Sequence, residues 1–427
     1  MEAFDLSSHR QVALVDSSPW WASGRVDSPQ GDARGDEARI SCANLMASSG
    51  NPARNQALDV LRGLAVVLVL LNHISLDGLD PDGWTCRLLR VAKRGGWMGV
   101  DLFFVLSGFL VASLIFREHL RHGSFWAGRF LVRRGFKIYP SFYLFLAVMS
   151  GWFVFADKGY LKRQFLYEGL FVQNYFYGLF NHTWSLAVEE HFYLGLTAVC
   201  ALGAGISRRL GRTTRFGWIP LLGLVLAVMT CYWRWQRFQE RPDYDFYFHS
   251  AATHLRVDSL MTGVLLAWVI AFRPALGTIG TGLWGRLGVG VGALSVITLP
   301  FFFSREAHPW LTIFGLPLIA GASMVLIRLA IEMPVSGNWI FRSIAWLGQY
   351  SYTAYLWHMV ANELAIYAHM CWGVGQWGLY GTLYLGLTGL LAWFSGRLIE
   401  QPLLTLRDRL FRSRSTALQD RLGRVSV

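Results

Sequence analysis

The stretch TWSLAVEEHFYLGL, residues 183–196, places Glu189, Glu190 and His191 side by side within an otherwise apolar segment. Carboxylate and imidazole groups are common proton donors and acceptors in catalysis at neutral pH. A charged side chain near the middle of a membrane helix costs about 2.5 to 3.5 kcal/mol on insertion scales, so such a residue is a candidate for function. Successive residues on a helix point about 100° apart, and the three side chains therefore cannot all face one cavity.

Arg62 and His73 lie eleven residues apart in the first apolar segment. Eleven helical steps return to nearly the same face, about 16 Å further along the axis. One side of this helix therefore carries a guanidinium near one end and an imidazole near the other. Imidazole titrates near neutral pH, which makes His73 a candidate general base. The alternatives are a cationic anchor for Arg62 and an interfacial histidine for His73.

A second group of ionisable residues is formed by Asp101 and by the sequence HLRVDSLMTG, residues 254–263. Asp101 stands one turn into its segment, where the helix dipole favours a carboxylate, and its functional interpretation is a pair with a histidine or arginine across the bundle. His254 and Asp258 are i and i+4 neighbours that can hydrogen bond along one helical face. With Arg256 between them, we expect a polar cavity that binds substrate.

The sequence GQYSYTAYLWHMV, residues 348–360, places Ser351, Tyr355 and His358 at positions i, i+4 and i+7. This spacing puts the three side chains on one face of a helix. We expect Tyr355 and His358 to line a substrate cavity. The alternative is aromatic packing around one polar side chain that its neighbours satisfy.

Arg133 and Arg134 belong to a basic group that also contains Arg129 and Lys137. Planar guanidinium groups bind phosphate in bidentate fashion, so this group suits an anionic cofactor with several phosphates. The alternative is that these cations only set the orientation of the chain in a membrane.

The composition predicts the elements that must position these residues. The chain has 427 residues, 53% hydrophobic and only 15% charged, which is too apolar for an ordinary soluble protein. A helix needs about 20 apolar residues to cross a bilayer. We therefore expect an all-α polytopic membrane protein, a bundle of about ten transmembrane helices. The ten segments lie near 57–77, 97–116, 136–156, 184–206, 217–235, 253–272, 285–303, 310–331, 345–368 and 376–398.

Charge predicts the orientation and the domains. The connections after the second and fourth segments and the C-terminal region are rich in arginine, so both termini are expected in the cytoplasm. The first 50 residues contain no apolar core of a secretory signal peptide. We expect a flexible polar tail over 1–54, a transmembrane domain over 55–405 and a basic tail over 406–427.

The remaining composition argues against other classes of function. The net charge of +12 is explained by topology, and nucleic-acid binding is not expected. The five cysteines have no C-x-x-C spacing, so neither a zinc site nor a redox pair is indicated. A disulfide between Cys86 and Cys371 stays an open alternative.

Several motifs together resemble the acyltransferase 3 family of integral membrane acyl-CoA-dependent O-acyltransferases. The resemblance covers roughly residues 55–405 and rests on the order and spacing of its pieces. They are the Arg62 and His73 pair, GVDLFFVLSGFL at 99–110, RRGFKIYP at 133–140, TWSLAVEEHFYL at 183–194, LRVDSLMTGVLLA at 255–267, SYTAYLWH at 351–358 and IEQPL at 399–403.

The resemblance implies a ten-helix bundle that takes an acyl group, often acetyl, from cytoplasmic acyl-CoA and places it on a hydroxyl of a carbohydrate, glycolipid or macrolide-like acceptor. It also implies a multi-pass location in a bacterial inner (plasma) membrane, in contact with the lipid bilayer, and no metal. His191 stands where the family more often has glutamine. The family's functional positions fall on Arg62, His73, Arg133, Arg134, Tyr139, Trp184, Ser185 and Glu189.

Acyl transfer from a thioester to an alcohol needs a base for the hydroxyl proton and a donor for the developing oxyanion. We expect His73 as the base, Glu189 or Asp101 as the carboxylate that orients it, and Arg62, Arg133, Arg134 and Tyr139 at the donor. Direct transfer and an acyl-histidine relay both stay open. The alternative function is a secondary transporter, because buried ionisable residues also build proton and substrate pathways.

Overall fold

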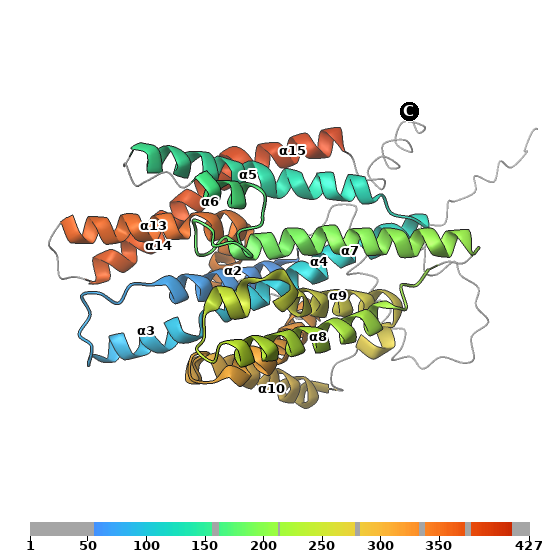
Figure 1. Cartoon of the computed structure of the whole chain (residues 1–427), viewed down its shortest axis with the longest axis horizontal. Coiled ribbons are helices and arrows are strands. Elements are labelled where there is room, and N and C mark those ends of the chain that lie inside the picture. The colour runs from blue at the N-terminus through green and yellow to red at the C-terminus, as the bar shows by residue number, and fades with distance from the viewer. Residues whose placement is uncertain are drawn as a thin grey trace, which may run out of the picture.

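The computed structural model describes residues 55–155, 162–211, 214–277, 282–332, 338–371 and 377–411, and within these ranges every element is a helix (Figure 1). The helices are α2 Gln56–His73, α3 Trp84–Gly95, α4 Met98–His122, α5 Ala127–Phe155, α6 Lys162–Gly169, α7 Trp184–Arg209, α8 Ile219–Glu240, η1 Tyr247–Ala251, η2 Thr253–Leu255, α9 Val257–Phe272, η3 Pro274–Gly277, α10 Gly282–Phe302, η4 Leu311–Gly315, α11 Leu316–Glu332, α12 Trp339–Gln349, α13 Ser351–Cys371, α14 Trp377–Ser395, η5 Gly396–Glu400 and α15 Gln401–Leu410.

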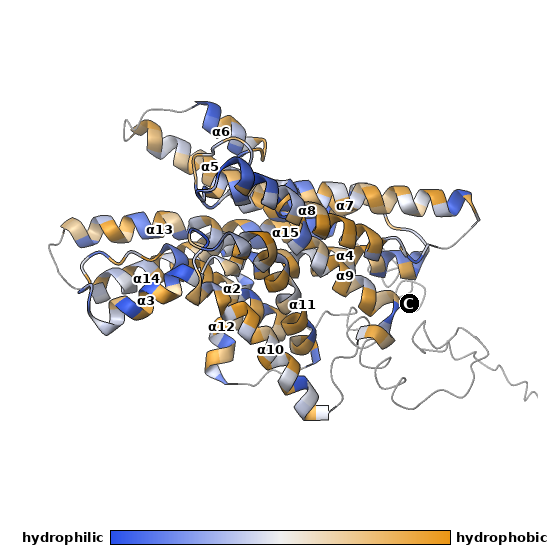
Figure 2. Cartoon of the chain, turned by 60° about the horizontal axis from the view of Figure 1, so that its bottom comes forward, coloured by the Kyte–Doolittle hydropathy of each residue, from blue (hydrophilic) through white to orange (hydrophobic). Residues whose placement is uncertain are grey.

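Helices occupy each of the ten segments predicted from hydropathy. Among the described residues, six helical stretches are long and apolar enough to cross a membrane. Figure 2 shows mostly hydrophobic residues along α4 and α10, many hydrophilic residues on α3, and a hydrophilic end on α7. The structure therefore supports a multi-pass helical protein, and the expected count of ten spans stays a prediction.

The first helix begins and ends at residues that explain its length. The side chain of Asn55 accepts hydrogen bonds from the backbone amides of Ala57 and Leu58, at 3.1 and 3.4 Å, and so caps the helix. The helix ends at His73, because the next residue, Ile74, has an extended backbone. His73 therefore lies at the C-terminal end of the helix and not in its middle.

The centre of the bundle is built around α4 and α9. Gly108 of α4 faces the backbone of Leu260, and Gly263 of α9 faces the backbone of Val105, so the two helices approach closely. Their close crossing sets the position of the ionisable residues that both helices carry.

The described arginine-rich connections lie at one end of the bundle. The His119 ring, near the end of α4, hydrogen bonds the Thr214 carbonyl in the connection between α7 and α8, at 3.2 Å. At the same end Arg133 of α5 pairs with Asp408 of α15 at 2.8 Å. In Figure 1 the last residues of α7 extend toward this end of the molecule.

Four features differ from the sequence-based expectations. The connection 78–96, between the first two predicted segments, contains the helix α3. The predicted span 345–368 is two helices, α12 and α13, that meet at Tyr350. Residues 253–256 precede the α-helical part of their segment, and α15 continues to Leu410, into the predicted tail.

Other sequence-based expectations concern the cysteines and the ends of the chain. Cys86 and Cys371 are both free cysteines, so the disulfide is absent. The expected tail 1–54 and residues 412–427 lie outside the described residues.

Candidate functional site

Two cavities lie inside the bundle and share Val100 and Tyr355 in their walls. Their volumes are about 240 and 350 Å³. We call the first the basic cavity, because its wall includes Arg62, Arg117, Arg134 and Lys137. We call the second the aromatic cavity, because its wall includes Trp97, Trp184, Tyr244, Phe246 and Tyr247 beside His73 and His182.

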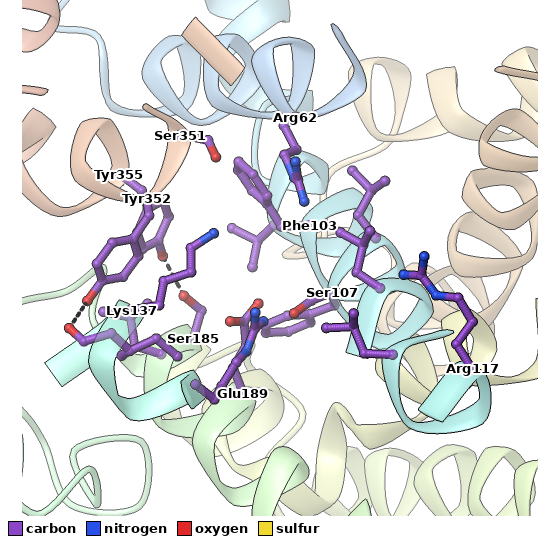
Figure 3. A pocket seen from close by; sticks show the side chains of 18 residues that line it. Arg62, Phe103, Ser107, Arg117, Lys137, Ser185, Glu189, Ser351, Tyr352 and Tyr355 are labelled. Carbon is purple, nitrogen blue, oxygen red and sulfur yellow. Dashed lines mark hydrogen bonds between the residues drawn. The ribbon is translucent and has the colours of Figure 1, made fainter. Parts of the chain in front are cut away.

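The basic cavity brings cations from three helices to one space. Figure 3 shows Arg62 of α2 and Lys137 of α5 turned toward the same cavity as Glu189. The Arg134 guanidinium lies over the Tyr193 ring, 4.5 Å from its centroid, and donates a hydrogen bond of 2.8 Å to the Tyr193 hydroxyl. Arg62 also forms an ion pair of 2.8 Å with Asp59. The cavity can therefore hold a polyanionic ligand.

Glu189 belongs to the basic cavity and not to His73. Its carboxylate accepts a 2.7 Å hydrogen bond from the hydroxyl of Tyr193, which also hydrogen bonds Ser107. His73 lines the aromatic cavity instead and contacts Val69 and His358. The pairing of Glu189 with His73 that we expected is wrong, because the two side chains face different cavities.

His73 and His358 form a pair whose protonation is fixed by carbonyl groups. The Nδ1 of His73 is 2.9 Å from the Val69 carbonyl, and the Nδ1 of His358 is 2.6 Å from the Tyr355 carbonyl. Carbonyls only accept, so in the neutral rings both Nδ1 atoms carry the proton. The Nε2 of His358, 3.3 Å from Nδ1 of His73, then accepts from it. This network leaves Nε2 of His73 unprotonated, as a general base requires.

A third histidine, His182, completes the cluster. Its ring centroid is 5.1 Å from that of His358, and its Nε2 lies 3.1 Å from the Leu356 carbonyl. Burial is the main cause that lowers the pKa of His182, to about 3, so the ring is neutral. Its Nδ1 is buried and has no hydrogen-bond partner among the described residues. Sequence reasoning missed His182 because it lies in a loop, and its adjacency to the TWS motif was the available signal.

Hydrogen bonds hold the end of α2 in place. The Asn362 amide donates to the His73 carbonyl at 2.9 Å, and the Tyr380 hydroxyl donates to the Asn362 side-chain oxygen at 2.6 Å. The backbone amide of Ser75 donates in turn to Tyr380 at 2.7 Å. The His73 ring is therefore fixed from both its side chain and its backbone.

Asp101 forms the predicted kind of pair, with an arginine. Its carboxylate is fully buried and accepts hydrogen bonds from Arg256 at 2.8 Å and from Ser259 at 3.1 Å. Arg256 lines the aromatic cavity, whereas Asp101 lines neither cavity. Asp101 therefore positions Arg256 and does not orient His73.

The predicted hydrogen bond between His254 and Asp258 is absent. His254 lies in the turn η2, before α9 begins at Val257, and its ring contacts Tyr175 at 3.3 Å. Asp258 pairs with the buried Arg234 at 2.7 Å. The expectation was wrong because an i, i+4 pair requires a continuous helix through both residues, and neither residue lines the two cavities.

Arg133 and Tyr139 also lie outside the basic cavity. Arg133 pairs with Asp408 and donates to the Phe411 carbonyl, and the Tyr139 hydroxyl donates to Glu190 at 2.8 Å. Consecutive residues on α5 point about 100° apart, so Arg134 faces inward while Arg133 faces α15. The helical spacing of Lys137 to Arg134, at i+3, was the signal for the second inward cation.

Other predicted residues meet at the wall that the two cavities share at Val100 and Tyr355, which we call the junction. Tyr355 lines both, and its hydroxyl lies 2.7 Å from the Ser185 hydroxyl and 2.5 Å from the His182 carbonyl. Trp184 faces the aromatic cavity while Ser185 faces the basic one. Ser351 lines the basic cavity, as its spacing on α13 predicts.

Comparison with known proteins identifies the family of the chain. A family model described as an acyltransferase domain matches residues 55–397. The chain belongs to the acyltransferase 3 family. No solved structure matches it.

Curated relatives are similar over most of this chain. The O-acetyltransferase OatA of Staphylococcus aureus is 27% identical over 376 residues, which are 83% of this chain and 58% of the relative. The peptidoglycan O-acetyltransferase OatA of Listeria monocytogenes is 26% identical over 369 residues, 81% of this chain and 55% of the relative. The putative peptidoglycan O-acetyltransferase YrhL of Bacillus subtilis is 27% identical over 379 residues, which are 84% of this chain and 56% of the relative. The chain thus spans a little over half the length of these relatives.

Proposed function

We propose that this protein is a membrane O-acyltransferase that moves an acyl group, most simply acetyl, from acyl-CoA to a hydroxyl of a saccharide or related acceptor. The observation that carries the proposal is the junction of two cavities of different chemistry at Tyr355. The basic cavity would hold the donor and the aromatic cavity the acceptor. The printed names of the relatives, O-acetyltransferase and peptidoglycan O-acetyltransferase, support acetyl as the group and a glycan as the acceptor.

The donor would bind through its phosphates to Arg62, Arg117, Arg134 and Lys137. Charge-assisted hydrogen bonds to phosphate are stronger than neutral ones, and a partly enclosed cavity strengthens them further. The arginine-rich end of the bundle would face the cytoplasm, with both termini on that side. Acyl-CoA then enters from the cytoplasm, with its thioester at the junction.

The acceptor hydroxyl would give its proton to Nε2 of His73 as its oxygen attacks the thioester carbonyl. The carbon–sulfur bond then breaks, and the CoA thiolate takes the proton from His73, which balances the transfer. The Val69 carbonyl and His358 both accept from Nδ1 of His73 and keep the imidazole in the tautomer that the reaction needs. The Ser185 hydroxyl would donate to the thioester oxygen, where charge develops, because Tyr355 gives its own proton to the His182 carbonyl and can only accept from Ser185.

The test separates donor binding from chemistry. In purified protein, CoA should raise the unfolding temperature of the wild type and of Arg133→Gln but not of Arg134→Gln, because only Arg134 lines the basic cavity. His73→Ala should keep the CoA effect and lose acyl transfer to a glycan acceptor. His369→Ala is the matched control, since this histidine of α13 lines neither cavity.

If CoA neither binds the wild type nor raises its unfolding temperature, the acyltransferase proposal fails. A transporter that uses the same buried ionisable residues would then be the better explanation. Acyl transfer at the wild-type rate in His73→Ala would refute only the assignment of His73 as the base, and not the acyltransferase proposal.

A further inference from the structure

Arg305 places a guanidinium in the aromatic cavity. It lies in the turn between α10 and η4, and its guanidinium carbon sits 4.4 Å from the Trp97 ring centroid, 5.0 Å from that of Tyr244 and 5.8 Å from that of Phe246. Ring faces attract a cation and hold it in one place, and Arg305 is partly buried between them. The ring faces thus hold the cation in the cavity wall.

In the described part of the chain, Arg305 makes no hydrogen bond and no ion pair. The three most buried arginines of the described residues each have an acidic partner: Arg234 pairs with Asp258 at 2.7 Å, Arg256 with Asp101 at 2.8 Å and Arg328 with Glu332 at 2.5 Å. Guanidinium carries five N–H donors in a fork that matches carboxylate and phosphate. The aromatic cavity therefore contains a fixed guanidinium whose N–H donors are available to bind a ligand.

We propose that Arg305 binds an anionic group of the acceptor, so that the aromatic cavity selects saccharides or related acceptors that carry a carboxylate or a phosphate. The inference rests on the proposed function, since it assigns the acceptor to this cavity. The aromatic walls contact the apolar faces of a sugar ring, and the guanidinium fork pairs with its charged group. This arrangement orients the acceptor relative to His73, which lines the same cavity.

Two other charged residues line the cavity and bear on this binding. Arg256 is neutralised by Asp101 behind it. Glu306 follows Arg305 in the wall, but its side chain is exposed and forms no ion pair with Arg305. A carboxylate at this place opposes an anionic ligand, so Glu306→Gln should tighten anion binding.

The experiment measures dissociation constants of three probe sugars, glucose, glucuronate and glucose 6-phosphate, with the purified full chain. Wild type should bind at least one anionic sugar about tenfold more tightly than glucose, the ratio expected for a charge-assisted hydrogen bond. Arg305→Gln should erase the preference, and Arg305→Lys should keep part of it. Arg134→Gln should keep all of it, which excludes binding of the probes in the basic cavity.

Equal affinity for the three sugars, no binding of any of them, or an anion preference that survives Arg305→Gln would each overturn the proposal. Preference for glucuronate alone identifies a carboxylate, and preference for glucose 6-phosphate alone identifies a phosphate. Stabilisation by CoA is measured separately, so a failure here is distinguishable from a failure of the acyltransferase proposal.

Discussion

His358 is a positioning residue rather than a catalytic one, because it touches His73 and not the reacting atoms. Its Nε2 shares the Nδ1 proton of His73 with the Val69 carbonyl, and so supports the tautomer that leaves the second nitrogen available. We expect His358→Ala to lower kcat about 10- to 100-fold, the range seen when an orienting partner is removed, with the KM for acyl-CoA unchanged. The measurement is steady-state kinetics across pH.

A purely structural role for His358 would give a different result. His358→Gln keeps a side-chain acceptor and should recover part of the activity lost in His358→Ala. The pH at which activity is half maximal should shift in both variants, because the hydrogen bond that sets the basicity of His73 is changed. If kcat falls only in proportion to the amount of folded protein, the positioning role is refuted.

At the residue scale, helical periodicity predicted which way some side chains face and failed for others. The cavity face shared by Ser351 and Tyr355 was predictable because one uninterrupted helix carries both. His358, which we expected to line a substrate cavity, lines neither cavity and contacts His73 instead. A neighbouring pair such as Arg133 and Arg134 could not be separated, since the sequence does not say which way α5 is rotated about its axis. Ion-pair partners that lie far apart in the chain can be identified only when the packing of the helices is known.

At the scale of elements, α6 and its carboxylate hold the loop that carries His182. One oxygen of Glu168 accepts from the backbone amides of Leu179 and Phe180, at 3.0 and 3.2 Å, and from the Thr183 hydroxyl at 3.0 Å. Burial outweighs these hydrogen bonds and raises the pKa of Glu168 from 4.5 to about 7. The loop is thus tied down by a carboxyl group that keeps its proton in mildly acidic solution.

This raised pKa predicts how stability depends on pH. Between pH 4.5 and 7 the unfolded chain loses the Glu168 proton while the folded chain keeps it, so this group's contribution to stability is complete below pH 4.5 and is lost as pH rises to about 7. The loss is at most about 3 kcal/mol. Glu168→Gln should flatten this part of the curve of unfolding temperature against pH. An unchanged slope in the variant would contradict the assignment.

The close crossing of α4 and α9 predicts which glycines are needed. A Cβ atom at Gly108 would meet the backbone of Leu260, whereas one at Gly292 would meet no atom within 4 Å. We expect Gly108→Ala to destabilise the protein by about 1 to 3 kcal/mol, the usual cost of overpacking, and to loosen the pair of Asp101 and Arg256. Gly292→Ala is the matched control. Equal unfolding temperatures for the two variants would show that the crossing can relax.

The glycine motif GVGVGA, residues 288–293, shows the limit of sequence reasoning about elements. Its glycines suggest close packing of helices. In the structure Gly288 and Gly292 have open space beside them, while Gly63 and Gly348 make a close contact between α2 and α12. Hydropathy predicts that a segment is a helix, but which glycine meets a neighbour depends on how the helices cross. Hydropathy also did not predict the break at Tyr350, because the segments on both sides of it are apolar.

At the scale of the whole molecule, the two cavities lie toward opposite ends of the bundle. His73 and His358 lie beyond the junction at Tyr355, and α13 continues past His358 to Cys371. The basic cavity lies on the opposite side of the junction, toward the arginine-rich connections. A donor from the cytoplasm and an acceptor from outside would therefore meet without crossing each other. Composition predicts a membrane bundle with an orientation, but it could not predict two cavities, since their walls come from five or more distant segments.

The direction can be tested with native cysteines. Cys371 is exposed, whereas Cys86 and Cys200 are buried, and Cys42 falls in the predicted cytoplasmic tail outside the described residues. A maleimide that does not cross membranes should label Cys371 in right-side-out vesicles and Cys42 only in inverted ones. Cys371→Ser and Cys42→Ser identify each signal. Labelling of Cys371 only in inverted vesicles would reverse the orientation and place the basic cavity outside, where acyl-CoA cannot reach it, because the arginine-rich end and Cys371 lie at opposite ends of the same bundle.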